Sequence, residues 1–494
     1  MIIVGIIVIG FILRIINLNQ SLWLDEAVQA ITAQKSFGFI FQELSGDFHP
    51  PLYHFLMHFW VRAFGSSEVV LRMPSVLFGV GTIYLVWKIG RLSNLRRLSY
   101  LGALFLATAP FHIYYSQEAR MYSLAAFLTT GSFYFFLRIL EDDRGWLKDR
   151  AGIGYFIFTL LALYTDYYVF LVLLAQMIVL AIKKKYKPII LYFPPSGGIP
   201  LMAVTLFIIL CYLPWLPMFI VQLKVGMLAT QSLPGWEKLV NVSFLKAIPL
   251  TLIKFTIGRI TIFDKKVYGM VAVSLMAGYS WLMIKGVRGW LKETKGQLKN
   301  KLGDVKGTII IMWFFIPLLI AWLVSFFIPN FQPFRLLLIL PAFYLLLAQG
   351  IYNVKSPLIQ KLFIFLILSI NFVSLGVYYF NSFFHREDWR GTVAYLSKKP
   401  DTVVILPSET SNWPIRYYDP EQKINLFMVA KEVGVVGEIG EIGGGKESQI
   451  YYIRYLVPLF DPKEKILQSL SDRGYNKTKE ISFNQIPLWE FEKK

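Results

Sequence analysis

The chain has 494 residues, of which 55% are hydrophobic and only 16% carry a charge, and its mean hydropathy is +0.52. This excess of apolar residues excludes an ordinary soluble domain and indicates a protein embedded in a bilayer. The formal net charge of +19 does not indicate nucleic-acid binding, because the basic residues stand in short clusters between apolar runs. The single cysteine, Cys211, excludes an intramolecular disulfide and a zinc site built from several cysteines.

Apolar runs of roughly membrane-spanning length predict a polytopic α-helical membrane protein with about eleven transmembrane helices. The first run begins at Met1 without a basic segment before it and without a small-residue cleavage site after it, so we expect a membrane helix and not a removed signal peptide. The runs cover residues 2–17, 69–88, 98–115, 121–140, 152–166, 167–183, 198–220, 267–285, 308–328, 335–352 and 358–380.

Alternate loops between these runs are rich in lysine and arginine, whereas the loop 18–66 holds only Lys35 and Arg62. Because basic loops stay in the cytoplasm, we expect a cytoplasmic N-terminus, and every residue after about 380 outside. The basic residues are Lys88, Arg91, Arg96, Arg97, Arg144, Lys148, Arg150, Lys183, Lys184, Lys185, Lys187, Lys285, Arg288, Lys292, Lys295, Lys299, Lys301, Lys306, Lys355 and Lys361.

The tail 381–494 has a different pattern from the rest of the chain. Strand-like stretches at 403–406, 424–429 and 450–453 alternate with helix-like segments at 388–397 and 462–470. We therefore predict a transmembrane domain over 1–380 and a small extracytoplasmic α/β domain over 381–494. The glycine-rich stretch from Gly434 to Gly445 lacks the Lys-Ser/Thr ending of a phosphate loop, so we interpret it as a flexible connection.

The loop after the first apolar run begins with two adjacent acids, Asp25 and Glu26, next to Trp23. A carboxylate near apolar groups and a second negative charge becomes more basic, which suits a general base. The same pair is also typical of a helix N-terminus, where acids interact favourably with the helix dipole.

The same loop continues with His49-Pro50-Pro51-Leu52-Tyr53, in which the two prolines fix the backbone. Such a segment can hold a rigid surface over a cavity, or it can form a simple loop corner. His54 and His58 are four residues apart, a spacing found in metal sites, but no third ligand is indicated. Amphipathic side chains on an interfacial helix explain the spacing equally well, and we predict no metal site.

Glu118 and Arg120 lie in a second external turn, between two predicted membrane helices. They can form an internal ion pair, or they can supply a second site carboxylate and an arginine for a phosphate. Arg14, Arg72 and Arg335 also fall at predicted external helix ends. Each alone can extend to lipid headgroups, but together they indicate an anion site.

Four segments occur in an order that resembles a known group: Leu24-Asp25-Glu26, His49-Pro50-Pro51-Leu52-Tyr53, Arg72-Met73-Pro74-Ser75, and Tyr115 to Tyr122. They are similar to the dolichyl-phosphate-mannose protein mannosyltransferase-like and aminoarabinose-transferase-like membrane glycosyltransferases of the GT-C fold (families 39 and 83). Looser likenesses are Tyr164 to Tyr168, Pro214-Trp215, Phe334-Arg335-Leu336 with Pro341, and Glu387 to Arg390.

The resemblance implies an inverting glycosyltransferase of the cell envelope that takes its sugar from a polyprenyl phosphate. It implies that Asp25 is the catalytic base and that Glu118 supports it, with Glu26 beside them. The substrate-binding candidates are Arg14, His49, Tyr53, Arg72, Tyr115, Arg120, Tyr122, Asp166 and Arg335. No cofactor is required in principle, although a divalent cation is compatible. The acceptor, a glycan, lipid or protein, is not specified, and the long soluble acceptor-binding modules of eukaryotic protein mannosyltransferases are absent.

A transporter or flippase for a lipid-linked glycan is the main alternative, because it also needs arginines within the membrane. It would show inverted repeats, broken helices and charges on both faces. The polar candidates here cluster on one face, which favours an enzyme. A non-catalytic envelope scaffold is a third alternative, but it gives no reason for paired acids after the first helix.

Overall fold

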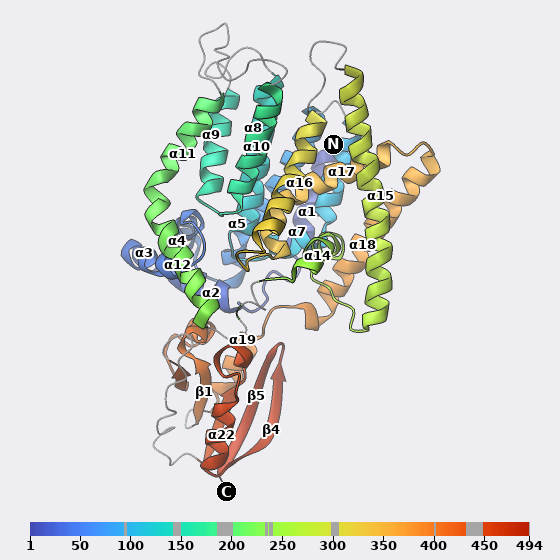
Figure 1. The fold of residues 1–494 in the computed structure, drawn as a ribbon. Helices are drawn as coiled ribbons and strands as arrows, with labels where there is room; N and C mark the ends of the chain where they lie inside the picture. Colours follow the sequence, from blue (N-terminus) through green and yellow to red (C-terminus); the bar gives the residue numbers. More distant parts are fainter. Residues whose placement is uncertain are drawn as a thin grey trace.

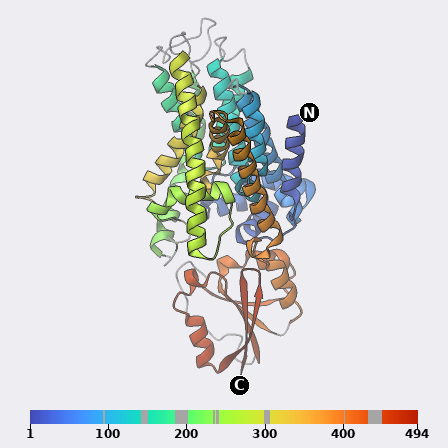
Figure 2. The ribbon, with the colours of Figure 1, turned by 90° about the vertical axis from the view of Figure 1, so that its right-hand side faces the viewer.

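The computed structural model describes residues 1–92, 96–141, 150–184, 201–232, 236, 241–297, 306–399, 402–430 and 448–493. A long bundle of helices forms most of the molecule, and a small α/β domain lies at one end of it (Figure 1, Figure 2). Several segments interpreted from the sequence fall outside the described residues: Arg144, Lys148, Lys185, Lys187, Lys299, Lys301 and Gly434 to Gly445.

Seven helices of the described segments are long and apolar enough to cross a membrane, and four shorter apolar helices accompany them. Together they fall in the eleven predicted runs. The bundle contains α1 (Ile2–Ile15), α5 (Glu68–Leu92), α6 (Arg96–Thr108), α8 (Tyr122–Glu141), α9 (Arg150–Leu163), α10 (Val169–Lys184), α11 (Leu201–Tyr212), α12 (Leu216–Ser232), α15 (Lys265–Gln297), α16 (Lys306–Val324), α17 (Leu340–Tyr352) and α18 (Pro357–Phe380).

Proline divides two of the predicted continuous runs. The run 98–115 is two helices, because Pro110 begins the separate helix α7 (Pro110–Ser116) after α6 has ended at Thr108. Proline has no N–H to donate and suits the first turn of a new helix. In the run 198–220, the 3₁₀ turn η2 (Leu213–Trp215), which contains Pro214, separates α11 from α12.

Short helices gather at the end of the bundle that faces the α/β domain (Figure 1). The first external loop forms α2 (Leu24–Gln34), α3 (Phe37–Gly46) and α4 (Leu52–Phe64), and α14 (Phe244–Ile257) lies against α7. The close approach of α14 and α7 requires Gly258, whose φ is +72° and where an added Cβ would lie 2.9 Å from the Cβ of Pro110. The 3₁₀ helix η3 (Pro333–Ile339) leads into α17 at the same end.

The C-terminal domain is built on a five-stranded sheet with strand order β2-β1-β3-β5-β4. Strand β1 pairs in parallel with β2 and β3, and β5 pairs antiparallel with β3 and β4. The strands are β1 (Val403–Ser408), β2 (Asn425–Ala430), β3 (Gln449–Ile453), β4 (Tyr475–Phe483) and β5 (Ile486–Lys493); the helices are α19 (Trp389–Leu396), α20 (Trp413–Tyr418), α21 (Val457–Phe460) and α22 (Lys465–Asp472).

Polar contacts attach this domain to the segment before α2. The backbone N–H of Leu22 donates to the hydroxyl of Tyr418 at 2.8 Å, and that hydroxyl donates to Glu68 at 3.1 Å. The backbone N–H of Arg390 donates to the hydroxyl of Ser21 at 3.1 Å. The α/β domain is therefore fixed next to the acids that the sequence singled out.

Candidate active site

The first turn of α2 carries both Asp25 and Glu26, and Glu26 forms an ion pair with Arg72. Glu26 is completely buried and accepts two hydrogen bonds from the guanidinium of Arg72, the first of them 2.8 Å long. Arg72 also donates to the backbone oxygens of Leu18, Gln20 and Ser21. The arginine is thereby satisfied on all sides, so neither residue has surface to offer a substrate.

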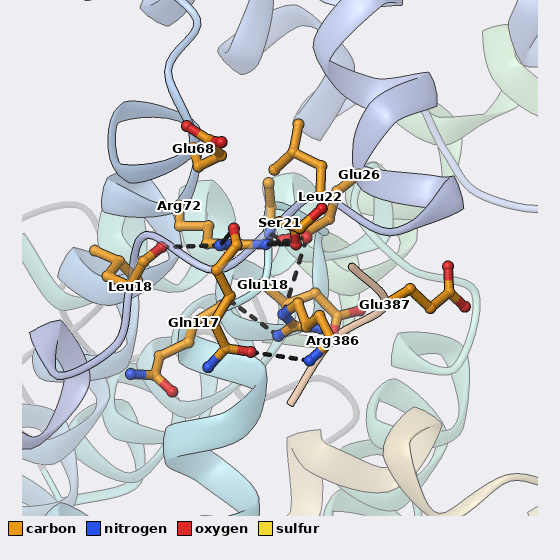
Figure 3. A network of polar contacts seen from close by, with 12 residues as sticks. Leu18, Ser21, Leu22, Glu26, Glu68, Arg72, Gln117, Glu118, Arg386 and Glu387 are labelled. Atoms are coloured by element: carbon orange, nitrogen blue, oxygen red, sulfur yellow. Dashed lines mark hydrogen bonds and ion pairs between the residues drawn. The ribbon is translucent and has the colours of Figure 1, made fainter. Parts of the chain in front are cut away.

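A second arginine joins this pair to the acid of the second loop (Figure 3). Arg386 donates to Glu118 Oε2 at 3.1 Å, and its Nε lies 3.8 Å from Glu26 Oε2. It also donates to the hydroxyl of Tyr114 and to the backbone oxygen of Gln117. Two carboxylates and two guanidinium groups therefore form one buried network, in which the pairing offsets the cost of burying charge.

Asp25 points elsewhere and remains partly open. Its side chain is 39% exposed, and its Oδ2 lies 3.8 Å from Nη2 of Arg120, longer than a hydrogen bond. Arg120 is buried, and its Nε has no hydrogen-bond partner among the described residues. The pair therefore keeps an acceptor and donors available.

Electrostatics separate the two acids of α2. Burial raises the pKa of Asp25 above its ordinary value, and Asp47 and Glu26 add to this, while Arg120 and His49 oppose it. Burial alone would also raise the pKa of Glu26, but Arg72 and Arg386 together bring it below the usual range. Asp25 is thus the more basic carboxylate, whereas Glu26 stays ionised as a structural charge.

Asp47 organises the histidines of the first loop. Its Oδ1 lies 3.0 Å from Nδ1 of His49, and its Oδ2 lies 3.0 Å from Nε2 of His54. His49 Nδ1 is also 3.4 Å from Nη2 of Arg120. Burial would raise the pKa of Asp47, but His49, His54 and Arg120 hold it well below its usual range. His49 is therefore fixed between Asp47 and Arg120.

Aromatic rings separate Arg120 from Arg335. Tyr122 packs edge-on against Tyr115 and Phe334, with ring centroids 5.4 and 5.1 Å away. The guanidinium of Arg335 lies over Phe334 at 5.8 Å, and its Nε is a second buried donor without a partner in the described part of the chain.

Asp166 also belongs to this neighbourhood. It is buried, and it accepts a hydrogen bond from the backbone N–H of Tyr168 at 2.8 Å. Burial raises its pKa, and His49, the Tyr168 N–H and Arg335 act in the opposite direction.

The structure places two predicted binding residues within the packed interior. Arg14 is fully buried and donates to the backbone oxygens of Gly10 and Ala107, and its Nη2 lies 2.7 Å from Nδ1 of His112. The hydroxyl of Tyr53 lies 3.2 Å from that of Ser75. Both side chains hold helices together here, so we propose packing roles for them in place of substrate contacts.

His54 and His58 share a face of α4 but have different partners, because Nδ1 of His58 lies 2.9 Å from the backbone oxygen of Ala33. A search of the described residues finds no group of three or more histidine, cysteine or acidic side chains arranged for a metal ion.

Neither Arg386 nor Asp47 was identified from the sequence as a member of the candidate site. Glu387 was named only in a segment that loosely resembles the family. Glu387 accepts hydrogen bonds from Trp389 Nε1 at 2.8 Å and from the Tyr455 hydroxyl at 3.0 Å. The pKa of Glu387 is raised to about 7, because burial and nearby Asp25 raise it by more than those two hydrogen bonds lower it. The position of Arg386 and Glu387 shortly after the last membrane helix was a further signal for these two residues, whereas no pattern singled out Asp47.

The Glu26–Arg72 pair yields a stability prediction. Glu26→Gln removes the carboxylate that pairs with Arg72 and leaves this buried guanidinium with neutral backbone oxygens as its partners among the described residues, which typically costs about 3–5 kcal/mol. We expect a clearly lower melting temperature for the detergent-solubilised variant, measured by size-exclusion chromatography after heating. Glu421→Gln is the matched control, because Glu421 pairs with Lys423 on an exposed surface and such pairs contribute little. Equal melting temperatures for the two variants would show that the buried pair is not structural.

Comparison with known proteins shows which family model and which solved structures this chain is similar to. Residues 48–216 match the family model described as dolichyl-phosphate-mannose-protein mannosyltransferase. A search of curated protein sequences finds no match. Among solved structures, ArnT from Cupriavidus metallidurans is similar in its apo state, with TM-score 0.55, 10% identity, and coverage of 99% of this chain and 97% of that one. The same protein bound to undecaprenyl phosphate gives a TM-score of 0.54 at 10% identity and the same coverage.

A second similar structure is the archaeal oligosaccharyltransferase AglB from Archaeoglobus fulgidus, in complex with an inhibitory peptide and a dolichol-phosphate. It has TM-score 0.50 and 13% identity, and the match covers 86% of this chain. This chain spans only 63% of the length of that protein. The oligosaccharyltransferase was also solved in complex with Zn and sulfate, with TM-score 0.53, 13% identity, and coverage of 98% of this chain and 72% of that one. At these identities the likeness establishes a shared fold.

Proposed function

We propose that this polytopic membrane protein, which matches a protein mannosyltransferase family model over residues 48–216 and shares its fold with solved GT-C glycosyltransferases, transfers a sugar from a polyprenyl-phosphate donor to an acceptor hydroxyl, with inversion, outside the cytoplasm. The observation that carries the proposal is the Asp25–Arg120 pair: a partly exposed, more basic carboxylate facing a buried arginine whose Nε has no hydrogen-bond partner in the described part of the chain.

In this mechanism Asp25 accepts the proton of the acceptor hydroxyl while the acceptor oxygen attacks the anomeric carbon. The bond from that carbon to the phosphate oxygen breaks, and its electron pair leaves with the lipid phosphate. The phosphate departs already ionised and needs no general acid, and a single direct attack inverts the anomeric centre. Arg120, and Arg335 beyond the aromatic rings, supply donors for the developing charge.

The comparisons support this choice of donor class. ArnT was solved with undecaprenyl phosphate and AglB with a dolichol-phosphate, and this chain shares their fold. The proposed acceptor is a cell-envelope glycan, lipid or protein. A direct test is intact-lipid mass spectrometry of cells with and without the gene. We expect a polyprenyl-phosphate sugar to accumulate and one envelope component to lose a sugar. Unchanged lipids and envelope in the deleted strain would contradict the proposal.

The site must lie outside the cytoplasm, which a labelling experiment can test. Ser471 is on α22 of the C-terminal domain and Lys355 is in the loop before α18; both are exposed. In a Cys211→Ser background, we expect an impermeant thiol reagent to label Ser471→Cys in intact spheroplasts but Lys355→Cys only after lysis. The opposite pattern would invert the topology and exclude an external site.

A further inference from the structure

Arg386 belongs to the segment between the last membrane helix, α18, and the first helix of the C-terminal domain, α19. Its side chain is only 2% exposed. A cation buried at such a junction requires charged partners, and those partners show what the junction does.

Its partners come from the two external loops that carry the proposed site. The guanidinium contacts Glu118 of the second loop at 3.1 Å and Glu26 of the first loop at 3.8 Å, and it stacks on the ring of Tyr114 at 4.6 Å. Figure 3 shows Arg386 directed into this network and the neighbouring Glu387 directed away from it. One side chain of the tail therefore joins both loops.

The joined acids flank the residues assigned to the chemistry. Asp25 precedes Glu26, and Arg120 follows Glu118 by two residues, with Ala119 between them. Glu26 also accepts a hydrogen bond from the backbone N–H of Ala119 at 2.8 Å. The contacts of Glu26 and Arg386 therefore hold the two loops together on either side of the Asp25–Arg120 pair, whose side chains lie 3.8 Å apart.

We propose that Arg386 is a positioning residue for the transfer reaction: it couples docking of the C-terminal domain to the alignment of Asp25 with Arg120. The inference rests on the proposed function. Arg386 itself has no surface for a substrate, so its effect must pass through the two loops. Misalignment of a base relative to a bound donor lowers the rate of the chemical step more than it lowers donor affinity.

Variants of this network can distinguish the effect of the Arg386 charge on stability from its effect on the alignment of Asp25 with Arg120. It contains two guanidinium groups, Arg72 and Arg386, and two carboxylates, Glu26 and Glu118. Arg386→Gln leaves an unbalanced buried carboxylate, whereas Arg386→Gln combined with Glu118→Gln restores the balance without restoring the connection between the loops. Arg386→Lys keeps the charge, but an ammonium cannot reproduce the fork of a guanidinium.

The experiment compares full-length purified variants for melting temperature, kcat and donor KM, with Arg390→Gln as control. Arg390 lies four residues further along the chain, in the first turn of α19, and its side chain pairs with Glu68 but is 50% exposed. We expect the double variant to recover much of the stability lost in Arg386→Gln. We also expect kcat of the double variant and of Arg386→Lys to fall by about tenfold or more, with donor KM within about threefold of wild type.

Wild-type kcat in Arg386→Lys or in the double variant would overturn the proposal, because charge alone would then suffice. If the double variant fails to fold, Arg386→Lys alone decides the question through its kcat and KM. A failure of the proposed function would look different: the wild-type protein and Arg390→Gln would transfer no sugar from any polyprenyl-phosphate donor tested.

Discussion

Replacing Asp25 with asparagine is expected to cut sugar transfer by about a hundred- to ten-thousandfold, the usual contribution of a general base. The amide has nearly the same shape but cannot accept the proton. Because the side chain is 39% exposed and makes no close hydrogen bond to Arg120, we expect the variant to stay folded and to bind donor. The measurement is consumption of a polyprenyl-phosphate sugar by purified protein supplied with envelope extract as acceptor.

The pH dependence provides a second test of the same residue. The base must be deprotonated, so wild-type activity should fall as the pH drops through the pKa of Asp25, which lies above the ordinary aspartate value. The residual activity of Asp25→Asn should lack this acid limb. Asp472→Asn is the control, because Asp472 is exposed on α22. Turnover of Asp25→Asn close to that of Asp472→Asn would remove Asp25 from the mechanism.

Replacing Arg120 with lysine is expected to weaken donor use by about ten- to a hundredfold, the worth of one strong charge-assisted hydrogen bond. Lysine keeps a positive charge beside Asp25 but cannot donate two parallel hydrogen bonds to a phosphate. The Nε of Arg120, which has no partner among the residues that the structure describes, is the donor that such a contact would use. The measurements are donor KM and binding of undecaprenyl phosphate in nanodiscs, each compared with the melting temperature.

Arg390→Lys is the matched control, because it makes the same change at an arginine whose side chain is 50% exposed. If the Arg120→Lys variant binds the donor normally, the positive charge of Arg120 in the native protein serves only to neutralise Asp25. Arg335 is then the next candidate for the phosphate, because its Nε is also buried without a partner in the described residues. Arg335→Lys should in that case show the loss of donor binding that Arg120→Lys lacks.

The membrane helices could be predicted from the sequence because length and hydropathy are local properties. The hairpin of β4 and β5 could not, because β4 carries Asn476, Lys477, Thr478 and Lys479 along an exposed face and has little apolar pattern. Strands β1, β2 and β3 were recognised because their residues are mostly apolar, and those of β1 and most of those of β3 are buried.

The different roles of Asp25 and Glu26 could not be predicted from the sequence, for another reason. The sequence marked Asp25 and Glu26 together, but adjacent residues on a helix point about 100° apart, so one can face the interior while the other remains open. Which of them faces inward depends on Arg72 and Arg386, the latter 360 residues away from Glu26 along the chain. Such long-range pairings leave no local pattern.

The position of Arg386 after the last membrane helix has a consequence for how the protein is made. During synthesis, both acid-bearing loops emerge long before the segment that holds Arg386. Until that segment has docked, Glu118 lacks the guanidinium that pairs with it, and the two loops are joined without the contacts of Arg386. If Arg386 has the positioning role that we propose, an unfinished chain would not align Asp25 with Arg120, and it would not transfer sugar before its own assembly is complete.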